Sequence, residues 1–219
     1  MGTTLLAGFE ANARNDLKDL DGTNYLWTTA ELDRHIQHAV NDYQRILPLV
    51  SALAITVVAV GPNSLTRRQQ VTGPPAGYLW TERVEYPIDH DPPAYLPFWE
   101  EIVGGGSLYF PVGDPPTAGD QMKVWYALTH TLTNATSTIP TDHEELIALG
   151  AAAYAAQAAT RYAQHRLNAS LWTPRGIQVF ATERMAEYQA RLADLRAQYE
   201  TAGRPMPQWG EVPDSWSEL

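Results

Sequence analysis

One stretch, from Thr141 to Tyr199, restricts the fold more than any other, because it predicts two helices folded back on each other. It opens on Pro140, Thr141 and Glu144, which have the types and spacing of a capping box, and continues in strong helix formers rich in Ala. The second half follows Pro174 and repeats apolar residues in a heptad seam, namely Ile177, Ala181, Met185, Tyr188, Leu192, Leu195 and Tyr199. A small-residue helix beside a heptad helix predicts close packing and indicates no chemistry.

The composition limits the class of protein. The chain has 219 residues, 44% of them hydrophobic, which is enough for one large domain or two small ones with a core. It contains no Cys, and this excludes disulfides, thiolate catalysis and Cys-ligated zinc. The longest apolar run, Leu49 to Val60, is too short to cross a bilayer. We therefore expect no membrane partner.

The charge argues against a nucleic-acid binder. Lys and Arg number 15 and Asp and Glu number 25, so the formal net charge is −10, and no segment is basic. Because affinity for phosphates comes from basic side chains that displace counterions, we expect no specific grip on DNA. An acidic surface would suit a protein past which DNA slides, although solubility alone also explains it.

A second helix start lies near the N-terminus, after a short amphipathic piece within the first 26 residues. Thr28 and Glu31 form another capping box, and Trp27 and Leu32 stand at the positions of a hydrophobic staple. An apolar helical face continues to Pro48, which should end the helix.

The middle of the chain predicts strands separated by Gly and Pro. They are expected at 51–60, where the run of apolar residues predicts a buried strand, and at 78–86, 107–112 and 121–131. The predicted fold class is therefore α+β, with a bundle of three main helices from residues 1–50 and 141–200. Residues 51–140 form a β-rich insertion, an antiparallel sheet or small sandwich, and 201–219 an extended C-terminal arm.

The sequence offers few candidates for chemistry. His35 and His38 share a helix face and could hold a metal, but a solvated face also explains them. The triplet Asp89 to Asp91 precedes two prolines, which favours a polar turn. We expect no catalytic residue, no metal and no cofactor.

Three tryptophans of the β-rich part, Trp80, Trp99 and Trp125, leave two interpretations open. They could stack on a sugar, or they could fill a sandwich core or a subunit interface. The pair Trp209 and Trp216 in the C-terminal arm is better suited to anchoring in a partner's pocket than to standing in water.

Several segments in order resemble the head-to-tail connector (adaptor) proteins of tailed bacteriophages, over about residues 20–200. They are WTTAEL, with the following IQHAVNDYQRILP; the strand edge RVEYP; VWYALTH; and STIPTDHEELIALGAAAYA. These segments run from Trp27 to Pro48, Arg83 to Pro87, Val124 to His130 and Ser137 to Ala155. The match is a pattern of elements and contains no catalytic motif.

The resemblance implies a structural protein in the virion neck, assembled in the host cytoplasm. Such proteins form a homo-oligomeric ring, often of twelve copies, beneath the portal protein. The ring extends the DNA channel and gives the tail or a stopper protein its platform, while DNA passes through the lumen without specific binding. The alternatives are a tail terminator or stopper, a carbohydrate-binding β-sandwich module of a phage tail, and a metal-dependent hydrolase.

A closed ring requires one face of each subunit to contact a different face of the next. Leu146, Leu149 and Ala153 lie on one side of the Ala-rich helix, which leaves Ile147, Tyr154 and Tyr162 as expected subunit contacts. Trp209 and Trp216 are the expected portal-docking residues.

Overall fold

The computed structural model describes residues 4–23, 25–58, 68–70, 75–101, 107–111, 116–163 and 174–201. Within these ranges the protein is α+β, as predicted. The helices are α1 (Leu6–Leu17), α2 (Thr29–Ile46), α3 (Glu144–Ala163) and α4 (Pro174–Thr201), with a short 3-10 turn at Thr141–His143. The strands are β1 (Leu49–Thr56), β2 (Arg68–Gln70), β3 (Tyr78–Glu85), β4 (Tyr95–Leu96), β5 (Trp99–Glu101), β6 (Ser107–Tyr109) and β7 (Gln121–Leu128).

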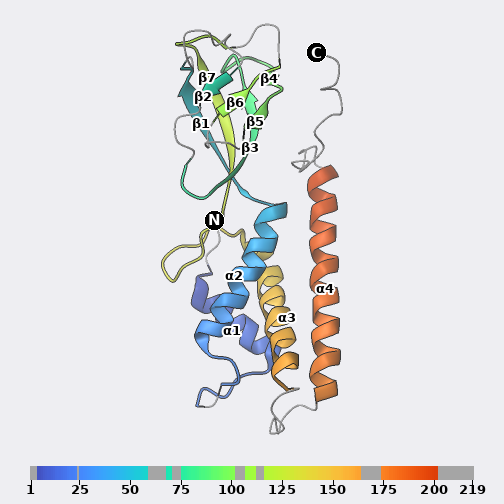
Figure 1. The fold of residues 1–219 in the computed structure, drawn as a ribbon. Coiled ribbons are helices and arrows are strands. Elements are labelled where there is room, and N and C mark those ends of the chain that lie inside the picture. The colour runs from blue at the N-terminus through green and yellow to red at the C-terminus, as the bar shows by residue number, and fades with distance from the viewer. Residues whose placement is uncertain are drawn as a thin grey trace.

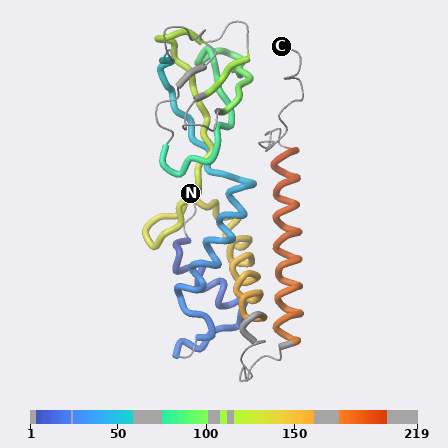
Figure 2. Tube along the Cα trace, in the orientation of Figure 1, coloured from blue at the N-terminus to red at the C-terminus, as the bar shows by residue number. Residues whose placement is uncertain are grey.

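The molecule is elongated, with the helices at one end and the strands at the other (Figure 1). The chain leaves the helices after α2, forms all seven described strands, and returns before α3 (Figure 2). The first and last parts of the chain therefore share one bundle, and the middle forms a separate β part beyond it.

Helix α3 is the centre of the bundle and packs against α1, α2 and α4. Its crossing with α2 and α4 depends on Gly150, where a Cβ atom would lie 2.6 Å from the ring of Tyr188 and 2.9 Å from the Cβ of Ala39. The Tyr188 hydroxyl donates to the Ala39 carbonyl across this crossing at 3.2 Å. The small residues around it are almost fully buried: Ala148, Ala151, Ala152, Ala153, Ala155 and Ala156.

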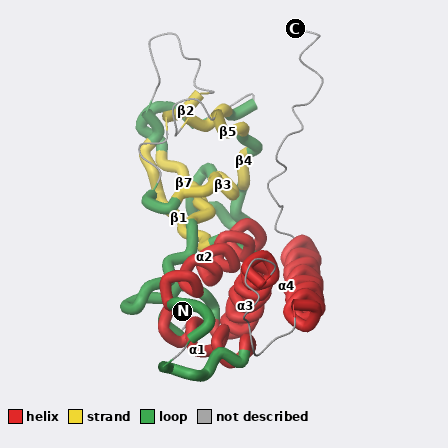
Figure 3. The backbone as a smooth tube through the Cα atoms, turned by 60° about the horizontal axis from the view of Figure 1, so that its bottom comes forward, coloured by secondary structure: helices red, strands yellow, loops and turns green. Residues whose placement is uncertain are grey.

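The heptad seam of α4 is confirmed. Five of its seven predicted positions are buried and the other two, Leu192 and Leu195, are partly buried against the same core. Most of the remaining α4 side chains are exposed, and Figure 3 shows α4 at the edge of the bundle beside α3. This helix is thus attached along one stripe and presents the rest of its surface outward.

The two predicted capping boxes have different outcomes. At Thr28 the box is present, because Glu31 N–H donates to the Thr28 hydroxyl and the Glu31 carboxylate accepts from Thr28 N–H. At Thr141 it is wrong: residues 141–143 form a 3-10 turn without a side-chain cap. The Glu144 carboxylate instead accepts hydrogen bonds from the backbone N–H and hydroxyl of Thr4. It therefore binds the N-terminal segment in place of the backbone N–H of Thr141.

The bundle has four helices in the described residues, where the sequence predicted three main ones. The additional helix is α1, whose Phe9, Ala13 and Leu17 are buried in the core. Its amphipathic pattern is weak because polar and small residues separate these three positions. Long-range packing against α3, more than local periodicity, explains its stability.

The β part consists of two antiparallel sheets around one core. The four-stranded sheet has the order β1-β7-β3-β4 and the three-stranded sheet the order β2-β6-β5. Val84 and Val124 from the first sheet pack in the same cluster as Leu108 and Phe110 from the second. The expected insertion is therefore a small two-sheet structure. Its short strands β2, β4 and β5 were not predicted, because two or three residues are too few for a periodic signal.

His130 fastens the β part to the bundle. Its backbone N–H donates to Gln44 Oε1 at 3.2 Å, and its ring nitrogens lie 2.9 Å from the Leu47 carbonyl and 3.1 Å from the Thr138 hydroxyl. Burial lowers the pKa of His130. The two chain crossings between the parts are thereby joined through one buried imidazole.

Candidate functional site

The expected subunit-contact residues of α3 do not form one surface. Ile147 is fully buried among α1, α2 and α4 residues, so the prediction that it faces a neighbouring subunit is wrong for this fold. Tyr154 is only partly buried, and its hydroxyl donates to the Asp42 carboxylate. The side chain of Tyr162 lies outside the described residues, as do Trp209 and Trp216.

The position of Ile147 was predicted incorrectly because α3 was expected to be covered on one side only. An Ala-rich helix has a small radius, and three neighbours can therefore approach it at once. Alanines at successive positions of α3 are buried, which shows that the helix is covered on several sides.

His35 and His38 lie in a groove between α2 and α3, lined also by Arg34, Tyr154 and Gln157. The two imidazole centroids are 6.2 Å apart, and the His38 ring meets the Tyr154 ring edge-on at 5.5 Å. Burial, with the nearby Arg34 charge, lowers the pKa of His35 to about 4. A zinc site needs at least three protein ligands, and the described residues contain no group of three His, Asp or Glu that could hold a metal.

The remaining candidates for chemistry have structural explanations. The segment Asp89 to Asp91 is a polar turn, as expected: Asp89 N–H donates to Glu85 Oε1, and His90 Nδ1 lies 3.1 Å from the Pro92 carbonyl oxygen. The Trp125 ring is covered by the Arg83 guanidinium, 4.2 Å from the ring centroid. The Trp99 ring stacks on Tyr109 with centroids 5.4 Å apart. Each of these partners occupies one face of its indole ring, so a sugar could stack only on the other face.

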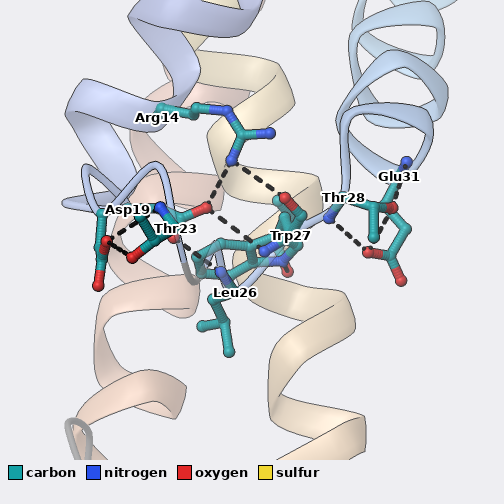
Figure 4. Close-up of polar contacts among 9 residues, drawn as sticks. Arg14, Asp19, Thr23, Leu26, Trp27, Thr28 and Glu31 are labelled. Atoms are coloured by element: carbon teal, nitrogen blue, oxygen red, sulfur yellow. Dashed lines mark hydrogen bonds and ion pairs between the residues drawn. The ribbon is translucent and has the colours of Figure 1, made fainter.

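The α1–α2 loop is a more informative region, because a buried ion pair fixes its shape (Figure 4). Arg14 Nη1 donates to Asp19 Oδ2 at 2.7 Å and to the Trp27 carbonyl at 3.0 Å. The Asp19 carboxylate also accepts from the backbone N–H groups of Leu26 and Trp27. The Asp19 carboxylate therefore joins the end of α1 to the residues that lead into α2.

The same loop is tied to α3 by Trp27. Its indole N–H donates to the Ala155 carbonyl at 3.3 Å, and its ring packs with Leu17 and Leu32. The Arg14 guanidinium also covers the ring of Tyr25, 3.7 Å from its centroid. Together these contacts hold the loop against the end of the bundle farthest from the β part (Figure 1).

The fixed loop presents apolar side chains to water. Leu20 is 63% exposed, and Tyr25 and Leu26 are also exposed. Beside them lies an apolar notch lined by Leu17, Leu26, Trp27, Ala156, Ala159, Ile177 and Phe180. We call Leu20, Tyr25, Leu26 and this notch the bundle tip. Exposed apolar side chains beside an apolar notch are typical of a protein-contact surface.

The bundle tip was not predicted from the sequence. Its signal was the pair Leu20 and Leu26 in a segment otherwise rich in Asp, Gly and Thr. Apolar residues in a predicted turn cannot be assigned to core or surface without the packing of α1, which the sequence did not establish.

Comparisons with known proteins complete the description. No protein-family model matches the sequence, and no curated protein matches it. Among solved structures, a chain in the neck of an empty gene transfer agent (GTA) particle, computed with C6 symmetry, has 15% identity and a TM-score of 0.28, covering 82% of this chain and 87% of that chain.

Two further solved chains are similar at the same level. A chain in the virion of a native GTA particle has 14% identity and a TM-score of 0.27, covering 79% of this chain and 86% of that one. A chain in the neck of the native GTA particle, computed with C12 symmetry, has 12% identity and a TM-score of 0.25, covering 84% and 93%. TM-scores below 0.5 do not establish a shared fold.

Proposed function

We propose that this chain is a non-enzymatic structural protein in the neck of a phage-like particle, where its copies form a ring. The observation that carries the proposal is the distribution of exposed apolar side chains at both ends of an elongated molecule. One group lies at the bundle tip, and another lies in the β part on Leu53, Val58, Tyr95 and Trp99. A subunit of a stacked ring needs uncovered contact surfaces both toward its neighbours in the ring and toward the proteins above and below it.

The bundle between these ends supports a wall-like role. Its α3 core is closed on itself, whereas α4 presents a long outer surface with charged residues of both signs. Several of these charges are already paired within the helix, as in Arg184–Glu187 and Arg196–Glu200. Such a surface can stand beside a neighbouring bundle without requiring it for folding.

The finer role that we propose is the adaptor beneath the portal, with twelve copies around a lumen through which DNA passes. The phage-connector resemblance of the sequence supports this role, and the net charge of −10 agrees with a channel that does not hold DNA. The GTA neck chains are too distant, by TM-score, to support it. A tail terminator or stopper is the nearest alternative.

Electron microscopy of particles containing a tagged copy of the chain would test the proposal. The expected result is tag density in the neck, touching the portal ring. Density at the end of the tail tube would favour a terminator, and density below another ring would favour a stopper. A chain absent from purified particles, or present only in the capsid or tail fibres, would overturn the neck assignment.

A further inference from the structure

The β part has four exposed large apolar side chains in its described residues, and they lie in two pairs. Leu53 and Val58 belong to β1 and the residues that follow it, and we call them the β1 edge. Tyr95 and Trp99 belong to β4 and β5, and we call them the aromatic edge. Because β1 and β4 are the two end strands of the four-stranded sheet, the two edges lie on opposite sides of the β part (Figure 1).

The β1 edge lacks the features that protect end strands. Strand β1 has the sequence LVSALAIT, with no charge and no proline, over eight residues. Of the described strands only β7 pairs with it, so its outer row of backbone groups has no strand partner. Natural sheets usually place lysine, proline or a bulge at such an edge to prevent pairing with another chain. This edge is therefore open to contact with another chain.

Leu53 strengthens this interpretation. It pairs with Val124, so the two side chains lie on the same face of the sheet. Val124 is fully buried in the core, but Leu53 is 46% exposed. The apolar layer of the sandwich thus continues onto the end strand β1, where it is no longer covered. Four successive residues of this strand, 51 to 54, are exposed.

The aromatic edge provides a complementary surface. Tyr95 is 49% exposed, and Trp99 is exposed to a similar degree while its ring stacks on Tyr109. Strand β4 has only two residues and lies between Pro93 and Pro97. Prolines restrict main-chain pairing on this side, so its contact would be made chiefly by aromatic side chains against Leu53 and Val58, with the outer backbone groups of β1 left in contact with water.

We infer that the β1 edge of one copy docks against the aromatic edge of the next copy. This inference rests on the proposed ring and names its subunit contact. The two edges differ in sequence and lie on opposite sides of the β part, so the contact is heterologous and repeats from copy to copy, as a closed ring requires. Self-pairing of β1 would instead give an isologous dimer and leave the aromatic edge exposed.

Site-specific cross-linking tests this contact, and the absence of native Cys makes the background clean. The variants Leu53→Cys and Tyr95→Cys are treated with a bis-maleimide shorter than the width of the sheet, which is about 14 Å for three strand spacings. Each variant alone should give no cross-linked product. Their mixture should give a dimer and nothing larger, and the double variant should give a ladder of two, three and more chains.

A matched control replaces Tyr95→Cys with Val179→Cys. Val179 is also 49% exposed but lies on α4, away from both edges. We expect the Leu53–Tyr95 mixture to give about tenfold more cross-linked product than the Leu53–Val179 mixture, because docking raises the local concentration of the paired thiols. Circular dichroism confirms that each exposed-site variant is folded.

Different outcomes overturn the inference in different ways. A dimer from Leu53→Cys alone would show β1 self-pairing. Equal products with the Val179 control, both in concentrated solution and in assembled particles, would show no edge contact. If the chain is found in the neck but the ladder is missing there, this inference fails and the proposed function stands. If the ladder forms but the chain is absent from the neck, the edge contact stands and the proposed function fails.

Discussion

The helical bundle and the β part treat their apolar surface differently. In the bundle the central helix α3 is surrounded, and its apolar residues are buried on several sides. In the β part the core is narrow and its apolar layer reaches the surface at both sheet edges. Apolar surface in the interior of the bundle is therefore buried by folding. In the β part and at the bundle tip, folding leaves some apolar surface exposed.

The difference extends to polar groups. The bundle contains a buried ion pair, Arg14–Asp19. It also contains the Tyr188 hydroxyl, which bonds α4 to α2 beside Gly150 of α3. On the β1 edge no charged group is present at all. Substitutions in the first region should reduce stability, and substitutions in the second should leave stability unchanged but alter association. The following predictions test this contrast.

The largest effect is expected for Asp19→Ala. This change removes the acceptor of Arg14 and of two backbone N–H groups, and it leaves the Arg14 guanidinium buried without its partner. Breaking a buried pair in this way costs about 4 kcal/mol of unfolding free energy. Urea unfolding measures it, with Asp21→Ala as the control, since Asp21 is exposed in the same loop. Equal losses would show that the ion pair does not hold the loop.

Gly150→Val should reduce stability by about 3 kcal/mol, because the added atoms overlap the Tyr188 ring and the Ala39 methyl group. The matched control is Ala190→Val on the exposed surface of α4, which pays only the lower helix propensity of valine. Thermal unfolding of both variants compares them. A neutral Gly150→Val would contradict the close crossing of the three helices.

Acidification should weaken the bundle by about 2 kcal/mol between pH 6.5 and 4.5, through His35. Burial holds its folded-state pKa near 4, below the unfolded value, so the unfolded chain binds the proton first as the pH falls. The contribution is therefore complete above pH 6.5 and is lost toward pH 4. Unfolding curves of the protein and of His35→Gln should differ in their pH slope within this window, and parallel slopes would exclude His35 as the source.

The smallest effect is expected for Leu53→Lys. The side chain is exposed, so the free energy of unfolding should change by no more than about 0.5 kcal/mol. The same charge should abolish association through the β1 edge, because it would be buried without a partner. Sedimentation velocity and thermal unfolding together check both parts. A large loss of stability would show that Leu53 belongs to the core.

Much of the fold was predictable from local chemistry. The Thr28 capping box, the end of α2 before Pro48 and the heptad seam of α4 depend on neighbours in sequence, and all three are present. The Thr141 capping box failed because Thr4, distant in sequence, binds the Glu144 carboxylate. Local patterns cannot show such competition.

The contact surfaces were less predictable for the same reason. Ile147 was assigned outward and is buried, since the number of helices around α3 depends on α1. Leu53 was correctly placed in a strand, but the expectation that this strand is buried was wrong, since residues 51–54 are exposed. Only the strand order shows that this strand ends a sheet. Whether an apolar residue is core or contact is decided by tertiary arrangement.

The central claim is that copies of this chain form a ring in a particle neck, and electron microscopy of the chain with an isolated portal ring tests it most directly. The account predicts class averages in which a second ring, with the rotational symmetry of bound subunits, is added to one end of the portal. Portal rings that remain unchanged after incubation with excess folded chain, and a chain that forms no ring in particles, would contradict it.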